Sequence, residues 1–173
     1  MSLKVNLGDQ MPSVGLRATD GYLLNLRSFV GKQPSIVLFF GAPSLEGVAR
    51  QRGDDLVAAL VDGRRRLAAA GVGVVGVTTD SEAQQTAYVE EKQLPFLLLS
   101  DERRSAVETL GVATSKEGQN VNAQPTAFAV GSDGTILDIV EDASPRGLVA
   151  RLLDAFRDPD ADDVPVVPAA TAS

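Results

Sequence analysis

The side chains best suited to chemistry lie together at the start of a long predicted helix. Glu46 supplies a carboxylate, and Arg50 and Arg52 follow it within two turns. Either arginine could pair with Glu46 or hold an anionic ligand through its planar guanidinium. Ser44 is most simply the N-cap of this helix, because neither a histidine nor a nearby lysine is present to activate its hydroxyl as a nucleophile.

Two reactive residue types are absent from the 173-residue chain, which has no cysteine and no histidine. Thiolate chemistry and the Ser-His-Asp and Cys-His devices are therefore impossible. Zinc, copper, haem and iron–sulfur sites also lose their usual ligands. We expect neither a metal nor a cofactor, and carboxylates, arginines and hydroxyls are the remaining chemical groups.

Charge and hydropathy limit the expected partners. The 16 basic residues face 23 acidic ones, and the net charge of −7 repels nucleic acid and anionic membrane surfaces. The chain starts without a basic segment followed by an apolar core, and no apolar run approaches the roughly 18 residues of a membrane span. We expect a cytoplasmic protein that binds neither nucleic acid nor membrane, and its composition suggests a bacterial source.

Alternating apolar runs and amphipathic stretches indicate an α/β chain. Asp20-Gly21 between two apolar stretches predicts an N-terminal hairpin, and the runs at 35–40 and 72–78 are typical of strands buried on both faces. We expect further strands at 96–99, 126–130 and 135–140, helices at 45–69, 82–91, 102–110 and after an N-cap at Ser144, and a polar loop at 114–122. Gly53 and Gly63 are the positions at which the first of these helices is expected to bend.

One domain is expected over residues 1–156. A chain of this length buries roughly 70% of the surface that its unfolded form exposes, so it needs no disulfide or metal to fold. Residues 157–173 are rich in aspartate, proline and alanine without periodicity. This composition predicts a disordered acidic tail.

Three blocks of sequence follow one another in a specific order. They are Gly8-Asp9-Gln10-Met11-Pro12 with Leu26 to Phe40, Gly73 to Ser81 with Leu94 to Asp101, and Pro125-Thr126-Ala127-Phe128 with Asp133-Gly134-Thr135-Ile136. Together they resemble the alkyl hydroperoxide reductase and thiol-specific antioxidant family, the peroxiredoxins. The resemblance implies a thioredoxin-like α/β fold, with a mixed central sheet, flanking helices and an N-terminal β-hairpin. It also implies a homodimer.

The reactive centre of that family is missing. Its members carry Pro-x-x-x-Thr-x-x-Cys between the first buried strand and the long helix. In this chain Ala42, Glu46 and Ala49 stand at the proline, threonine and cysteine positions of that pattern. A second register, against the Cys-x-x-Cys of thioredoxin-like reductases, puts Ser44 and Gly47 at the two cysteines. Neither register contains a thiol, which excludes thiol peroxidase chemistry. One engineered exchange of cysteine would explain Ala49 alone and not the other replacements.

The arginine with which the family holds peroxide is absent as well. It would fall around Gln124 or Pro125, just before Thr126. Pro125 resembles the cis-proline of thioredoxins, which predicts a cis Gln124–Pro125 bond. The predicted binding pocket consists of Ser44, Ala49, Arg52, Gln124, Pro125 and Thr126.

Two functions are compatible with this pattern. The first is a non-redox binding or accessory protein that holds a small molecule or a protein partner. The second is an enzyme that uses the vacated pocket for acid–base chemistry of isomerase, lyase or hydrolase type on a small metabolite, with Glu46 as base and Arg50 or Arg52 stabilising charge. A residual redox role with an external cofactor has no motif behind it. A catalytic base should be partly buried beside a concave pocket, whereas a binding protein can leave Glu46 exposed.

Overall fold

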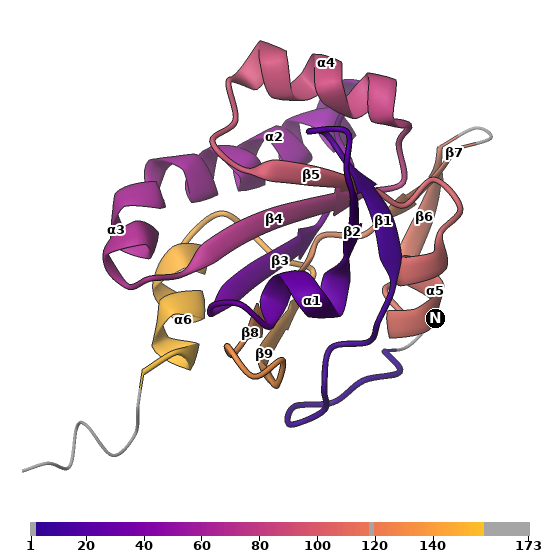
Figure 1. Ribbon diagram of the computed structural model, residues 1–173. Coiled ribbons are helices and arrows are strands. Elements are labelled where there is room, and N and C mark those ends of the chain that lie inside the picture. The colour runs from indigo at the N-terminus through magenta and orange to yellow at the C-terminus, as the bar shows by residue number, and fades with distance from the viewer. Residues whose placement is uncertain (1–2, 118–119, 158–173) are drawn as a thin grey trace, which may run out of the picture.

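The computed structural model describes residues 3–117 and 120–157, which form the layered α/β arrangement of Figure 1. The strands are β1 Gly15–Ala18, β2 Leu23–Asn25, β3 Ser35–Phe39, β4 Gly73–Thr78, β5 Leu97–Ser100, β6 Thr114–Glu117, β7 Asn120–Ala123, β8 Thr126–Val130 and β9 Ile136–Glu141. The helices are α1 Leu26–Val30, α2 Gly47–Asp62, α3 Arg64–Ala69, α4 Glu82–Lys92, α5 Ser105–Leu110 and α6 Leu148–Ala155. A seven-stranded sheet has the order β2-β1-β5-β4-β3-β8-β9, and β6 and β7 form a second sheet.

The central strands β3, β4 and β5 run parallel, because helical crossovers connect them. The neighbours β8 and β1 pair antiparallel with β3 and β5, so the sheet is mixed. Together with the β1-β2 hairpin and the helices on both faces (Figure 1), this confirms the predicted fold class. No helix of the described ranges is long and apolar enough to cross a membrane.

Two hydrophobic clusters fill the space on either side of the sheet. All five residues of β3 are buried, as a strand covered on both faces requires. Ile36 and Leu38 pack with α2, α3, α4 and α6, whereas Val37 and Phe39 pack with α1 and α5. The carboxyl ends of β3 and β4 therefore share one edge of a rigid sheet, and the candidate site lies in the loops beyond that edge.

One prediction of local structure was right only in part, and another was wrong. The helix expected over 45–69 is interrupted at Gly63, one of the two glycines expected to bend it: α2 ends at Asp62 and α3 begins at Arg64. The polar loop expected over 114–122 contains β6 and β7, in which Ser115 pairs with Asn122. Since these strands form a small sheet outside the main one, they do not need the apolar run by which buried strands are recognised.

The last helix starts later than predicted. Its N-cap is Gly147, at φ 72°, rather than Ser144, so Pro145 lies in the preceding turn. The apolar face is confirmed, since Leu148 and Leu152 are buried against the sheet. The predicted disordered tail over 157–173 lies outside the described residues, apart from Arg157.

The Gln124–Pro125 bond is trans, and the prediction of a cis bond was wrong. The trans form is favoured intrinsically by about 0.5–1 kcal/mol before proline. It is also compatible with the flanking backbone bonds: the Gln124 N–H donates to Ala113 O at 2.8 Å, and Pro125 O accepts from the Ala143 N–H at 2.9 Å.

Candidate functional site

A cavity of about 220 Å³ lies between the first turns of α2 and the segment that links β7 to β8. Four residues of the predicted pocket, Ala49, Arg52, Gln124 and Pro125, line it. The rest of its wall comes from Gly41, Leu45, Gly53, Ser115, Asn122 and Ala123. The fold thus brings the start of the long helix to the Gln124–Pro125 segment, and we name this space the Ala49 cavity.

Gly53 allows α2 to approach the end of β3 closely at this cavity. A Cβ atom on Gly53 would lie 2.0 Å from the carbonyl oxygen of Gly41 and 2.9 Å from Ala42 Cβ. Both distances are far shorter than a normal contact, so a larger residue requires the helix to move away. Glycine at this position therefore determines how close Ala49 lies to the opposite wall.

Glu46 lies outside the Ala49 cavity. It is the N-cap of α2, the place predicted for Ser44, but its exposed side chain caps no backbone N–H. Neither Arg50 nor Arg52 forms an ion pair with it, because each finds another carboxylate. The expected grouping of Glu46 with an arginine is therefore not formed.

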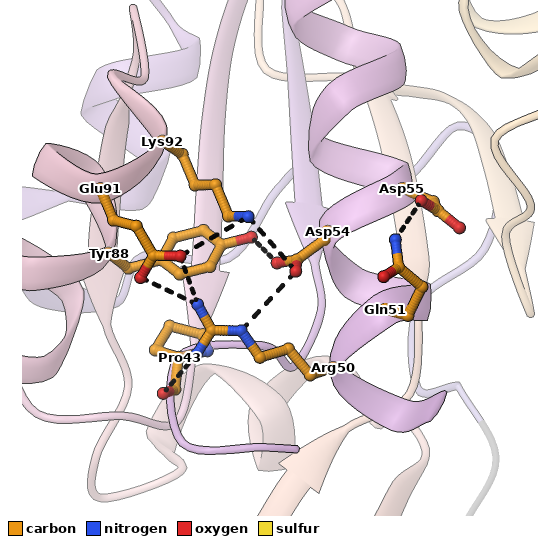
Figure 2. A network of polar contacts seen from close by, with 8 residues as sticks. All are labelled: Pro43, Arg50, Gln51, Asp54, Asp55, Tyr88, Glu91 and Lys92. Carbon is orange, nitrogen blue, oxygen red and sulfur yellow. Dashed lines mark hydrogen bonds and ion pairs between the residues drawn. The ribbon is translucent and has the colours of Figure 1, made fainter. Parts of the chain in front are cut away.

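Arg50 joins α2 to α4 in the polar network shown in Figure 2. Its Nη2 donates to both carboxylate oxygens of Glu91 at 3.1 Å, and its Nε lies 3.6 Å from Asp54 Oδ2. Tyr88 Oη donates to Asp54 Oδ1 at 2.6 Å, and Lys92 Nζ lies 3.4 Å from Asp54 Oδ2. Burial, followed by the hydrogen bond and charge of Asp54, raises the pKa of Tyr88 well above its usual value. Arg50 is thus engaged in packing two helices together.

The remaining predicted residues divide between two places. Arg52 lines the Ala49 cavity and pairs with Asp142. Thr126 is buried and donates through Oγ1 to the Gln124 carbonyl at 3.0 Å, as an ordinary strand residue does. Ser44 lines a different cavity, on the side of Thr79 and Asp80.

Comparison with known proteins identifies the family. A sequence profile described as the AhpC/TSA family matches residues 7–139 of this chain. The chain belongs to the AhpC/TSA family. The fold resembles that of a solved structure, because the crystal structure of peroxidoxin BcpB from Mycobacterium tuberculosis superposes on this chain with a TM-score of 0.74. The two share 20% identity over 88% of this chain and 98% of that chain.

Relatives of this AhpC/TSA chain include peroxiredoxins of plants and bacteria. Peroxiredoxin Q, chloroplastic, of Populus jackii is 36% identical over 109 residues, which are 63% of this chain and 48% of the relative. Peroxiredoxin Bcp of Escherichia coli K12 is 31% identical over 138 residues, which are 78% of this chain and 85% of the relative. The matched part spans about half the length of the chloroplastic relatives and most of the bacterial one.

This AhpC/TSA chain is a divergent member without the peroxidatic cysteine. No cysteine occurs anywhere in the sequence. Ala49, the residue that aligns with the cysteine of the family pattern, lies on the wall of the Ala49 cavity. Within residues 3–117 and 120–157, no group of three or more aspartate or glutamate residues is arranged to hold a metal ion. The site contains hydrogen-bonding groups and no thiolate.

Two buried polar residues near the site were not predicted from the sequence. Asn122 is 2% exposed and lines both cavities, and Asp80 is 3% exposed and lines the second one. Among the residues that the structure describes, Asn122 Nδ2 and Asp80 Oδ2 have no hydrogen-bond partner. A polar residue that follows a buried strand, as Asp80 follows β4, was an available signal, whereas Asn122 lay in a segment expected to be a loop.

Proposed function

We propose that this chain is a non-redox binding protein that holds a small molecule in the Ala49 cavity. The observation that carries the proposal is the cavity itself, which persists where the family pattern places its cysteine although that residue is an alanine. Arg52 and Gln124 offer donors, and Leu45 and Pro125 offer apolar surface. A few polar groups on a partly apolar wall are typical of small-molecule sites.

The ligand is expected to be a small polar molecule that accepts hydrogen bonds and carries no strong negative charge. Arg52 faces the cavity, but Asp142 already neutralises its guanidinium. An anionic ligand would have to compete with that carboxylate, whereas a neutral carbonyl or hydroxyl group would not. The volume of about 220 Å³ lies below the roughly 300–1,000 Å³ of drug-sized ligand sites.

An enzyme with Glu46 as general base is less well supported. A base must come within hydrogen-bonding reach of the proton that it removes, directly or through one water. Glu46 is exposed and lines neither cavity, and Arg50 is bound to Glu91 and Asp54. A binding or accessory role needs neither side chain at the ligand.

The test combines thermal shift and native mass spectrometry of the purified full chain with a metabolite extract. Ala49→Leu fills the cavity, and Ala58→Leu makes the same change on the exposed side of the same helix. We expect a bound molecule with the wild type, Ala58→Leu and Glu46→Gln, and none with Ala49→Leu.

Each other outcome has a definite meaning. Binding that survives Ala49→Leu rejects the Ala49 cavity as the site. A turnover that disappears in Glu46→Gln favours the enzyme. A co-purifying protein without any small molecule favours the accessory role.

A further inference from the structure

A second cavity, of about 270 Å³, lies beyond the carboxyl end of β4. Thr79 and Asp80 follow that strand directly, and Asn122 of β7 and Arg104 before α5 close the space. Ligands of open α/β sheets bind outside the carboxyl ends of the strands, so the position is favourable. We name this space the Asp80 cavity.

Two buried side chains that line the Asp80 cavity each carry a polar atom without a partner: an acceptor on Asp80 and a donor on Asn122. Asp80 is 3% exposed and Asn122 is 2% exposed, yet Asp80 Oδ2 and Asn122 Nδ2 make no hydrogen bond within the described part of the chain. Buried polar atoms are almost always paired, so two such atoms at one cavity point to a ligand or water that completes them. A ligand must therefore both donate to a carboxylate and accept from an amide.

The polypeptide around Asp80 is held firmly. The backbone N–H of Asp80 donates to Thr78 Oγ1 at 3.2 Å, and the backbone carbonyl oxygen of Asp80 accepts from Ser100 Oγ at 2.6 Å. On the other side, Thr79 Oγ1 donates to the Val121 carbonyl at 2.7 Å, which ties this loop to β7. Since these bonds fix the loop without using the Asp80 carboxylate, the carboxylate is preorganised for a ligand.

The rim of the cavity also combines an acceptor with a donor, here as two charged side chains. Glu102 and Arg104 both line it and are exposed, and neither side chain has a hydrogen bond or ion pair with the described part of the chain. Arg104 also adopts a left-handed backbone at φ 61°, which is uncommon outside glycine. The positive charge of Arg104 makes the cavity a poor site for a metal cation. Ser44, Thr79 and Ser81 also line it, and residues with hydroxyl groups do not favour an apolar ligand.

We propose that the Asp80 cavity binds a small zwitterion of the free amino acid class. The ammonium group would donate to Asp80, with Glu102 at the rim. The carboxylate would accept from Asn122 Nδ2 and from Arg104. Such a ligand satisfies both unpartnered atoms at once, and a volume of about 270 Å³ admits only a small molecule. This site shares Asn122 with the wall of the Ala49 cavity but does not depend on the function proposed for that cavity.

Isothermal titration calorimetry of the full chain tests the proposal with defined probes. Glycine, L-serine and L-glutamine carry both charges, serine methyl ester lacks the carboxylate, N-acetylserine lacks the ammonium, and glycerol has hydroxyls alone. We expect saturable binding of at least one amino acid, and at least about tenfold weaker binding of both analogues that lack one charge. Absence of amino acid binding at millimolar concentration, or equal binding of glycerol, would overturn the proposal.

Variants then locate the site. Asp80→Asn and Arg104→Gly should each weaken amino acid binding at least about tenfold, and glycine suits the backbone at φ 61°, so Arg104→Gly is expected to fold. Arg103→Gln, at the exposed neighbour outside this cavity, should bind like the wild type. Unchanged binding in Arg104→Gly would overturn the proposal.

The two proposed sites can fail independently. Amino acid binding that is lost in Ala49→Leu but kept in Asp80→Asn would place the ligand in the Ala49 cavity and refute this inference. Binding that is kept in Ala49→Leu and lost in Asp80→Asn supports it whether or not the Ala49 cavity has a ligand of its own.

Discussion

Gly53→Ala tests how closely α2 contacts the end of β3 beside the Ala49 cavity. In a helix interior, alanine is favoured over glycine by about 0.8–1.0 kcal/mol. The added Cβ would lie 2.0 Å from Gly41 O, and an ordinary contact needs at least 3.4 Å, so helix and strand must separate by more than 1 Å. Overpacking costs about 1–3 kcal/mol, and the upper end applies because the contact is with backbone. The expected net loss is about 2 kcal/mol.

Thermal denaturation followed by circular dichroism measures this loss. At about 2–4 °C per kcal/mol for a chain of this size, the Tm of Gly53→Ala should fall by about 4–8 °C. Ala58→Gly, on the exposed side of the same helix, reports the propensity difference alone and should lower the free energy of unfolding by about 1 kcal/mol. A Tm that rises in Gly53→Ala would show that the helix propensity of alanine dominates and that α2 does not contact Gly41 as closely as described.

The remaining predictions concern a thiol, a hydrogen bond and a pH dependence. Ala49→Cys creates the sole thiol of the chain, and its place in the first turn of α2 should lower the thiol pKa below about 8.5, measured by alkylation rate against pH. Peroxide consumption by this variant faster than by a free thiol would contradict the loss of the surrounding peroxidase site. Tyr88→Phe removes the 2.6 Å bond to Asp54 and should lower the free energy of unfolding in urea by about 1–2 kcal/mol; no change would mean that Arg50 and Lys92 satisfy Asp54 by themselves. Burial raises the pKa of Asp101 from its usual 3.8 despite hydrogen bonds from backbone N–H groups of α5, so its contribution to stability is complete below that value and is lost as pH rises through the folded-state pKa. In urea titrations, the free energy of unfolding of the wild type minus that of Asp101→Asn should therefore increase as pH falls from 7 to about 4. A difference that decreases over this range would refute the sign.

Local sequence patterns predicted most of the helices, strands and turns of the fold. Ser81 begins α4 with a capping box, and Asp20-Gly21 forms the turn between β1 and β2, as their sequences indicate. The β6-β7 pair escaped prediction because Ser115 and Asn122 pair in a small polar sheet and follow no buried-strand pattern. Gly63 was a sequence signal for the break between α2 and α3, although helical periodicity continues across it.

The sequence by itself determined the family and the chemistry that is excluded, because motif order and the absence of cysteine are properties of the chain alone. It also placed Ala49, Gln124 and Pro125 in one pocket through the family pattern and Arg52 through its position on the helix, and their role in binding stays a prediction. Tertiary structure decided the partners of each charge. Arg50 meets Glu91 because α4 packs beside α2. Asp80 and Asn122 share a cavity because the hydrogen bond from Thr79 to Val121 holds the loop after β4 against β7. Periodicity fixes which face of an element is buried, but the side chains that meet across that face come from distant segments, and only the packed chain brings them together.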